Sequence, residues 1–297
     1  MSTSHFKSGY VSITGRPNVG KSTLLNMILG QKIAIVTEKP QTTRNRIIGI
    51  KNLEGAQIIF IDTPGIHSPR HKLGEIMVKE AKEAIKDVDI VLLMVEPFKE
   101  KIKEEMEIIN LLRSVGKPVI LLINKIDKVR KQDILPLIDE YSKLFHFNEI
   151  IPISALYSDG IDRLLKVIVD TLPEGPLYYP PDQITDQIER FVIAELIREQ
   201  VMLHTREEVP HSVHVEVVDW KERENGLINI SANIYVERES QKGIIIGREG
   251  QRLKSIGTKA RKNIEGLLNA RVYLELWVKV KKNWRDNIYI LKELGFK

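Results

Sequence analysis

The segment from Gly15 to Ser22, Gly-Arg-Pro-Asn-Val-Gly-Lys-Ser, has the residue types and spacing of a phosphate-binding loop. It follows an apolar run and precedes a helical pattern, which is the context that the pattern G-x-x-x-x-G-K-[ST] requires. Glycines let backbone N–H groups converge on phosphate oxygens, and the following helix N-terminus adds partial positive charge. A chance glycine-rich turn is the weaker alternative. The expected phosphate-site contacts are Gly15, Arg16, Pro17, Asn18, Val19, Gly20, Lys21, Ser22 and Thr23.

Two of these side chains and a later motif would hold a triphosphate with its metal ion. Lys21 can reach the β- and γ-phosphates as a point charge, and the Ser22 hydroxyl is a hard oxygen ligand suited to Mg²⁺. The sequence Asp62-Thr-Pro-Gly65 ends a strand-like run, where the carboxylate can hold a water on Mg²⁺ and the glycine N–H can contact the γ-phosphate. The phosphate loop alone does not choose between ATP, GTP and other phosphate compounds.

The choice of base rests on two motifs that also end apolar runs. In Asn124-Lys-Ile-Asp127, the Asp127 carboxylate can accept hydrogen bonds from N1–H and the N2 amino group of guanine. Adenine offers no such donor pair, so a buried Asp127 would be left unpaired by ATP. The stem of Lys125 can cover the base. At Ser154-Ala155, small residues let a backbone N–H approach guanine O6. These motifs favour a guanine nucleotide.

Hydrolysis would depend on the loop after the first helix and on the residue after Gly65. Thr42 and Thr43 are adjacent candidates for a second hydroxyl ligand of Mg²⁺, and we favour Thr43. Ile66 stands where some GTPases carry a glutamine that orients water, and its side chain cannot hydrogen-bond to water. We therefore expect slow intrinsic hydrolysis, and hypothesise that Asn18 helps to bind K⁺ as an activating ion. The candidate catalytic groups are Lys21, Thr43, Asp62 and Gly65.

The elements that position these motifs alternate between strands and helices in the first half of the chain. Such alternation predicts a mostly parallel sheet with helices on both faces, whose ligand sites lie at the carboxyl ends of strands. Expected strands are Gly9–Thr14, Ile47–Ile50, Gln57–Ile61, Ile90–Val95, Val119–Ile123 and Ile150–Ile153, with helical patterns at Lys21–Leu29, Lys72–Lys86 and Lys99–Val115.

A proline-rich stretch, Leu172–Pro181, separates this half from the rest and predicts a linker. We expect domains at 1–175 and 183–297, with residues 176–182 between them. In the second, helices are expected at Asp186–Leu203 and Gln251–Leu268, and strands at Val213–Trp220, Leu227–Val236 and Arg271–Val280.

Charge is distributed unevenly between these halves. Residues 242–297 carry 14 Lys and Arg against 5 Asp and Glu, a net charge of +9, whereas the rest of the chain carries −4. A concentrated basic region is typical of polyanion binding, although a solvated charged face is the commoner reading of any single cluster. The same region contains Gly247-Arg-Glu-Gly250, whose glycines let the backbone approach a sugar-phosphate chain. We expect unpaired bases in an apolar groove lined by Ile244–Ile246 and Leu253.

Together the motifs GRPNVGKST, KPQTTR, DTPG, NKID and ISA, with the hydrophobic Ile66, resemble the TrmE–Era–EngA group of GTPases. The C-terminal half narrows the resemblance to the Era family, because GIIIGREG and the order of elements look like a type II K-homology (KH) domain. The resemblance implies an α/β P-loop GTPase domain followed by a smaller α+β KH domain. The implied RNA contacts are Lys242, Ile246, Gly247, Arg248, Glu249, Gly250, Arg252 and Lys254.

The resemblance also implies partners and a cellular location. Era-like proteins use GTP, GDP and Mg²⁺, bind the 3′ end of small-subunit ribosomal RNA and assist small-subunit assembly. They are mainly cytoplasmic, with some association with the inner face of the cell membrane, and we expect a monomer. The chain has no cysteine, which fits a reducing compartment, and its first ten residues lack the apolar core of a secretory signal.

Two other functions are less consistent with the residues. A tRNA-modifying GTPase is disfavoured by the absence of cysteine and by the GxxG module, and a membrane-remodelling or transport GTPase by the absence of a membrane-spanning apolar run. Trp277 and Trp284 are both candidates for stacking on RNA bases, but we expect Trp277 to pack in the core because it lies in an alternating strand.

Overall fold

The computed structural model describes residues 6–296. Residues 1–5, which begin the N-terminal stretch considered above, and residue 297 lie outside the described part. The chain forms two compact units. The described residues of the first unit are 6–34, 43–68 and 77–186, and those of the second are 35–42, 69–76 and 187–296.

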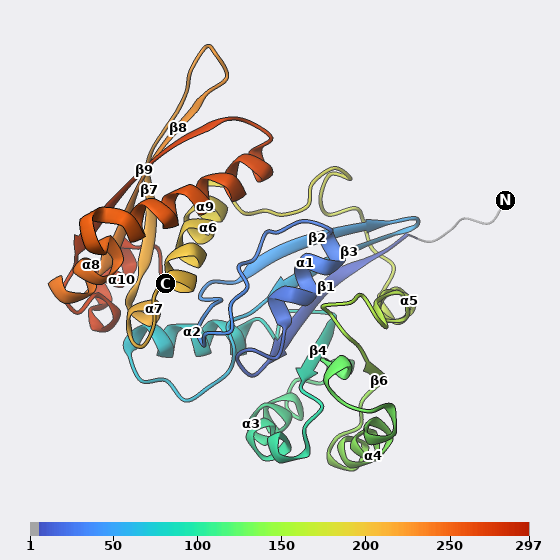
Figure 1. Ribbon diagram of the computed structural model, residues 1–297. Coiled ribbons are helices and arrows are strands. Elements are labelled where there is room, and N and C mark those ends of the chain that lie inside the picture. Colours follow the sequence, from blue (N-terminus) through green and yellow to red (C-terminus); the bar gives the residue numbers. More distant parts are fainter. Residues whose placement is uncertain (1–5, 297) are drawn as a thin grey trace. The chain divides into compact units, whose positions relative to one another are not determined.

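A six-stranded sheet in the order β2-β3-β1-β4-β5-β6 is the centre of the first unit (Figure 1). Strand β2 pairs antiparallel with β3, and the other pairs are parallel. Every residue of β4 and β5 is buried, as expected for parallel strands covered on both faces. The strands are β1 Lys7–Gly15, β2 Ile47–Leu53, β3 Ala56–Asp62, β4 Ile90–Val95, β5 Val119–Ile123 and β6 Glu149–Pro152.

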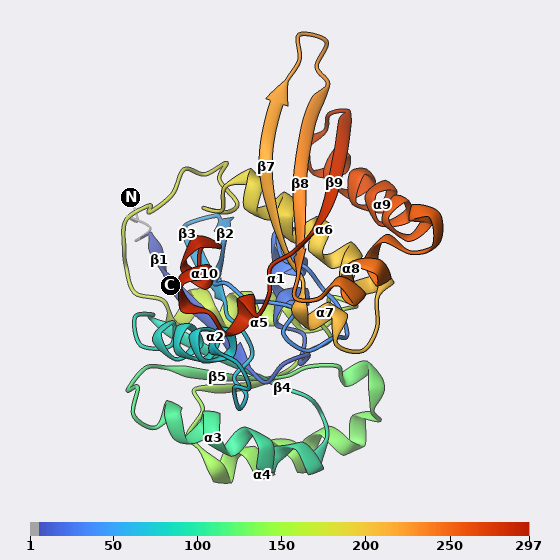
Figure 2. The same ribbon diagram turned by 90° about the vertical axis from the view of Figure 1, so that its left-hand side faces the viewer.

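Helices cover both faces of this sheet. Helices α3 and α4 lie on one face of β4 and β5, and α1 and α5 lie on the opposite side (Figure 2). The predicted α/β class is thereby confirmed. The helices are α1 Lys21–Leu29, α2 Lys72–Glu83, α3 Ile102–Leu112, α4 Ile134–Leu144 and α5 Ile161–Thr171, with short 3₁₀ turns at Lys99–Lys101, Ile126–Lys128 and Lys131–Asp133.

The proline-rich segment after α5 is hydrogen-bonded to the first unit. Gln57, which is fully buried on β3, accepts the backbone N–H groups of Tyr178 and Tyr179 at 2.9 and 3.0 Å. Its amide nitrogen donates to the Tyr179 carbonyl at 2.8 Å. Further along, Ile50 N donates to Ile184 O at 2.8 Å. The segment therefore has defined backbone partners, although it contains no helix.

The second unit has a three-stranded sheet in the order β7-β8-β9, in which β7 and β8 are antiparallel and β8 and β9 parallel. Apolar residues of the sheet, α6 and α9 form one buried cluster. The order α6-β7-β8-α8-GxxG-α9-β9 confirms the predicted KH arrangement. The elements are α6 Glu189–His204, α7 Val209–Ser212, β7 His214–Glu222, β8 Ile228–Val236, α8 Glu239–Ile246, α9 Gln251–Leu268, β9 Val272–Val280 and α10 Ile288–Glu293, with 3₁₀ turns at Arg248–Gly250 and Trp284–Asp286.

None of the helices between residues 6 and 296 combines the length and the apolar character that crossing a membrane requires.

The two tryptophans have the opposite roles to those predicted. Trp277 is 60% exposed, because it shares the outer face of β9 with Glu275 and Lys279. Trp284 is fully buried, donates its indole N–H to Ser212 O at 2.9 Å and lies against the ring of Phe296. The prediction that Trp277 packs in the core was wrong, and Trp284 is not available to stack on a base.

This contrast predicts a difference in stability. Trp284→Ala should lower the free energy of unfolding by about 3–5 kcal/mol, since it leaves a large cavity and an unpaired carbonyl. Trp277→Ala should change it by no more than about 0.5 kcal/mol, because the ring is mostly in water. Urea unfolding of the full chain measures both, and equal losses would contradict the burial described here.

Candidate functional site

The loop between β1 and α1 has a backbone that demands glycine. Gly20, the N-cap of α1, has φ +107°, and a Cβ there would lie 2.3 Å from Asn124 Nδ2. A side chain at Gly65 would meet the Pro17 backbone nitrogen at 2.6 Å, so the end of β3 closely approaches the same loop. Ile66 N also donates to Gly15 O at 3.3 Å. The backbone of the phosphate loop and the backbone of the DTPG motif are thus in direct contact.

Lys21 is buried inside this loop. Its ammonium donates to Arg16 O at 2.8 Å and to Gly15 O at 3.2 Å. Burial lowers the pKa of Lys21 to about 8, and the nearby Asp62 carboxylate opposes that shift. A phosphate placed among these amides would supply the negative charge that the buried ammonium lacks. The side chain is therefore positioned for the role predicted for it.

Three oxygen-bearing side chains meet beside Lys21 as a magnesium site would require. Ser22 Oγ donates to Asp62 Oδ2 at 2.7 Å and lies 2.8 Å from Thr43 Oγ1. Burial raises the pKa of Asp62 to about 6, and its Oδ1 has no hydrogen-bond partner among the described residues. A buried carboxylate oxygen without a partner and two hydroxyls form a donor set of the kind that Mg²⁺ and its waters bind.

The geometry also distinguishes the two adjacent threonines. Thr42 Oγ1 donates to Lys39 O at 2.6 Å and lies 2.7 Å from Thr37 Oγ1. Both partners of this hydroxyl belong to residues 37–42, away from Asp62. Thr43 Oγ1 lies 3.5 Å from Asp62 Oδ2. The structure therefore favours Thr43 as the metal ligand.

Residues 35–42, just before Thr43, belong to the second compact unit, where α6 holds them. Arg198 donates to Thr42 O, and Glu199 Oε1 accepts from Val36 N at 3.0 Å. The Lys39 ammonium donates to carbonyls at the C-terminal end of α6. Sequence reasoning gave no indication of these contacts.

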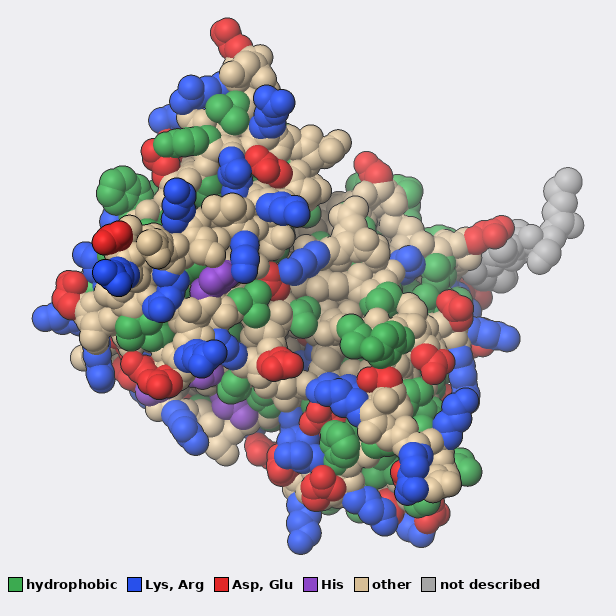
Figure 3. All heavy atoms as spheres, in the orientation of Figure 1, with side chains coloured by type: hydrophobic (Ala, Val, Ile, Leu, Met, Phe, Trp, Pro, Cys, Tyr) green, Lys and Arg blue, Asp and Glu red, His purple; other side chains and the backbone are tan. Residues whose placement is uncertain are grey.

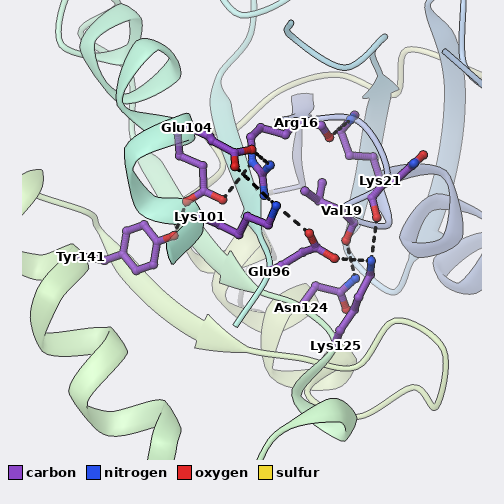
Figure 4. Close-up of polar contacts among 11 residues, drawn as sticks. Arg16, Val19, Lys21, Glu96, Lys101, Glu104, Asn124, Lys125 and Tyr141 are labelled. Atoms are coloured by element: carbon purple, nitrogen blue, oxygen red, sulfur yellow. Dashed lines mark hydrogen bonds and ion pairs between the residues drawn. The ribbon is translucent and has the colours of Figure 1, made fainter. Parts of the chain in front are cut away.

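Hydrogen bonds link the motifs predicted to bind the base to the phosphate loop, and Figure 4 shows Asn124 and Lys125 beside Val19 of that loop. Asn124 donates to Val19 O at 2.8 Å and accepts from Ala155 N at 2.9 Å. Lys125 donates to Asn18 O at 2.7 Å, and Ser154 Oγ donates to one oxygen of Asp127 at 2.6 Å.

Asp127 is exposed rather than buried. Its carboxylate is consequently open to an incoming base, with Ser154 fixing one of its oxygens. Only contact with the base would remove it from water, so the cost of an unmatched adenine would arise on binding.

The structure also places the side chains of Ile66 and Arg16. Ile66 is buried in the apolar cluster of the first unit, so its side chain takes no part in orienting water. The Arg16 side chain is bound by carboxylates on the α3 side, not by groups of the loop itself. Among the described residues, the contributions of Glu96 and Glu105 to this site were not predicted from the sequence.

In the second unit, the GxxG segment forms a tight turn between two helices. Gly247 ends α8 with φ +73°, Gly250 begins α9 with φ +75°, and Glu249 between them also has positive φ. The side chains of Arg248, Arg252 and Lys254 are exposed, whereas Lys242 and Ile246 are partly buried. Figure 3 shows many Lys and Arg side chains on the part of the surface that α9 forms.

The predicted apolar groove needs one correction. Ile245 is fully buried in the core of the second unit and cannot touch a base. Ile244 is exposed, and Ile246 and Leu253 are half-buried beside the turn. Only these three of the four predicted residues have apolar surface available.

Comparisons with known proteins identify a family for each half of the chain. Residues 10–125 match a family described as 50S ribosome-binding GTPase, and residues 208–285 match the KH domain family. The chain is 55% identical to the GTPase Era of Ruminiclostridium cellulolyticum, over 98% of each chain. The chain belongs to the Era family of GTPases. It is accordingly a GTPase, which converts GTP and water to GDP and phosphate.

Other members of the Era family match along the whole chain. The GTPase Era of Geotalea daltonii is 54% identical over the full length of both chains. A crystal structure of Era in complex with MgGDPNP and nucleotides 1506–1542 of 16S ribosomal RNA superposes with a TM-score of 0.93, at 45% identity over 98% of this chain and 99% of that chain. A crystal structure of a point variant of Aquifex aeolicus Era bound to GDP and AlF4⁻ gives the same TM-score, identity and coverage.

The position of Asp127 predicts a change in nucleotide specificity. Asp127→Asn should weaken GTP affinity by at least about tenfold and improve affinity for xanthosine triphosphate, because an amide can donate to the xanthine oxygen. Competition against a fluorescent GDP analogue measures both affinities. Asp133→Asn, the same substitution on an exposed surface, should bind like the wild type. GTP affinity that survives Asp127→Asn would contradict the assignment.

Proposed function

We propose that this GTPase is a molecular switch that binds the 3′ end of small-subunit ribosomal RNA through its second unit and assists assembly of the small ribosomal subunit. The observation that carries the proposal is the match, at a TM-score of 0.93 over nearly the whole chain, with an Era captured on nucleotides 1506–1542 of 16S ribosomal RNA. The exposed basic side chains around the GxxG turn support it, since RNA binding requires charge beside a close-fitting backbone.

The nucleotide site of the switch would bind GTP or GDP with Mg²⁺. Ser22 and Thr43 would ligate the ion directly and Asp62 through water, as their mutual distances allow. Lys21 and the Gly65 N–H would face the γ-phosphate. Because Ile66 is buried, intrinsic hydrolysis would be slow and would depend on backbone groups, on Mg²⁺ and on an activating partner or ion.

Coupling between nucleotide and RNA would act through residues 35–42. These residues lead directly into Thr43, and α6 of the second unit holds them through Arg198 and Glu199. A loop that serves one ligand while being held by the unit that binds the other can transmit binding free energy between them.

The proposal also covers the domain boundaries, the cellular location and the oligomeric state of the protein. We propose a GTPase domain at 1–175 and a KH domain at 183–297, with residues 176–182 between them. The resemblance to Era-like proteins supports a monomer in the cytoplasm with a peripheral contact at the inner face of the cell membrane.

The RNA proposal is tested at the GxxG turn. Gly247→Asp should weaken binding of an RNA oligonucleotide from the 3′ end of 16S RNA by at least about tenfold, because it adds negative charge where a phosphate would lie, and should leave GDP affinity unchanged. Electrophoretic mobility shift and fluorescent GDP binding measure the two.

Gly226→Asp is the matched control, since Gly226 also has positive φ and lies in the β7–β8 turn. If Gly247→Asp disturbs folding, Gly250→Asp replaces it, because a Cβ at Gly250 would meet nothing within 4 Å. RNA binding that withstands the added charge in a folded protein, with GTP hydrolysis intact, would refute this RNA site.

We further propose that Asn18 helps to bind K⁺ next to the phosphates. Asn18 has φ +64° and is exposed, and its carbonyl is fixed by Lys125. Hydrolysis should then be faster, by about tenfold or more, in potassium than in sodium buffer, and Asn18→Ala should remove the difference. Equal phosphate release in the two buffers would eliminate the hypothesis.

A further inference from the structure

A ring of charged side chains surrounds Arg16, the second residue of the phosphate loop. Its guanidinium lies 3.5 Å from Glu96 Oε2, donates to Glu104, and approaches Glu105 Oε1 to 3.4 Å through Nε. Figure 4 shows Arg16 close to Glu104 and Glu96, with Lys101 nearby and Lys125 next to Glu96. Arg16 is thus held by α3 and by the residue that follows β4.

Glu105 differs from the other two carboxylates because it is buried. It is 1% exposed, on the buried face of α3 that also carries Ile109 and Leu112 and belongs to the same apolar cluster as Leu137 of α4. Its second oxygen accepts a hydrogen bond from the hydroxyl of Tyr141, which is itself fully buried on α4. Placing a carboxylate here costs desolvation free energy that an apolar residue of similar size would avoid. The position is therefore poorly explained by packing alone.

Arg16 connects this buried pair to the nucleotide site. Its carbonyl accepts the Lys21 ammonium at 2.8 Å, so the backbone that carries Arg16 also sets where the phosphate-binding lysine rests. Glu96, which contacts Arg16, also binds Lys125 at 2.5 Å, and Lys125 donates to Asn18 O. The charged groups around Arg16 therefore contact the phosphate loop at two residues, Arg16 and Asn18.

We propose that Glu105 and Tyr141 are positioning residues of this GTPase, which hold Arg16, and through it the first turn of the phosphate loop, in the conformation that binds the nucleotide. Glu105 supplies the negative charge, and Tyr141 fixes the rotamer of Glu105 from the opposite side. Glu104 contributes less, because its side chain is 52% exposed and water screens its charge. The inference rests on guanine-nucleotide binding in the first unit and is independent of RNA.

The charge state of Glu105 predicts how the effect of this residue on nucleotide binding should depend on pH. Burial raises the pKa of Glu105 to about 7, and the Tyr141 hydroxyl and Arg16 oppose that shift. The other ionisable groups around the pair are Glu96, Glu104 and Lys101 beside Arg16, and Glu140 beside Tyr141. A raised carboxyl pKa means that the anion that holds Arg16 is present above pH 7 and is lost as the pH falls toward 6.

Glu105→Gln in the full chain tests the inference, with a fluorescent GDP analogue as the probe. The variant should bind about tenfold more weakly than the wild type at pH 8, the effect of losing one hydrogen bond to a charged group. The ratio of the two dissociation constants should fall toward one at pH 6, where the wild-type carboxyl is protonated. The pH dependence caused by other ionisable groups cancels in this ratio, because both proteins contain those groups.

A second measurement separates positioning from chemistry. The hydrolysis rate at saturating GTP should stay within about twofold of wild type, because a contact that holds the loop equally in the bound ground state and the transition state affects affinity and not the rate of the bound complex. Glu107→Gln, the same substitution on α3 at a side chain that is 64% exposed, should match the wild type throughout. In Arg16→Gln, adding Glu105→Gln should cause no further loss, since the two act as one unit.

Tyr141→Phe keeps the packing, removes one hydroxyl and should weaken binding in the same direction by a smaller factor. It replaces Glu105→Gln if thermal melting shows that the latter does not fold. A folded Glu105→Gln or Tyr141→Phe with wild-type affinity at pH 8 would overturn the inference, as would a loss that is equally large at pH 6. Failure of the wild-type chain to bind GDP would instead refute the nucleotide site itself.

Discussion

The nucleotide site depends on one buried amide, that of Asn124. Its nitrogen donates to Val19 O in the phosphate loop, and its oxygen accepts from Ala155 N after β6. Three segments that are far apart in the sequence are joined by two hydrogen bonds of one side chain. This is possible because parallel strands deliver their carboxyl ends to the same edge of a sheet. One side chain therefore links the phosphate-binding loop to two of the segments predicted to bind the base.

Sequence patterns sufficed where function depends on local backbone geometry or on a fixed order of motifs. Gly20 and Gly65 occupy places where a Cβ would clash, so their types are dictated by the same contacts that shape the pocket. Ser22, Thr43 and Asp62 follow from the motif order, and the structure brings their oxygens together. The order of elements in the second unit likewise identified a KH arrangement.

Other features needed three-dimensional information. Glu105 and Tyr141 form a buried pair although they lie on different helices and are 36 residues apart in the sequence. No sequence motif connects either residue to Arg16. Burial of Trp284 depends on α7 and on Phe296, which is equally nonlocal. For Trp277 the signal was present but misread, since the ring alternates in phase with Glu275 and Lys279, which mark the solvent face of β9.

Gln57 has a consequence for where the first unit can be separated from the rest of the chain. Its amide is fully buried, and Tyr178 and Tyr179 satisfy it by backbone hydrogen bonds. A fragment that stopped at residue 175 would remove both donors to the amide oxygen and leave the amide nitrogen with its bond to Asn52 Oδ1 at 2.7 Å. Ending the fragment near residue 186 would retain these bonds and the one from Ile50 to Ile184. Residues 176–186 therefore supply hydrogen bonds that the first unit would lose if it were cut directly after α5.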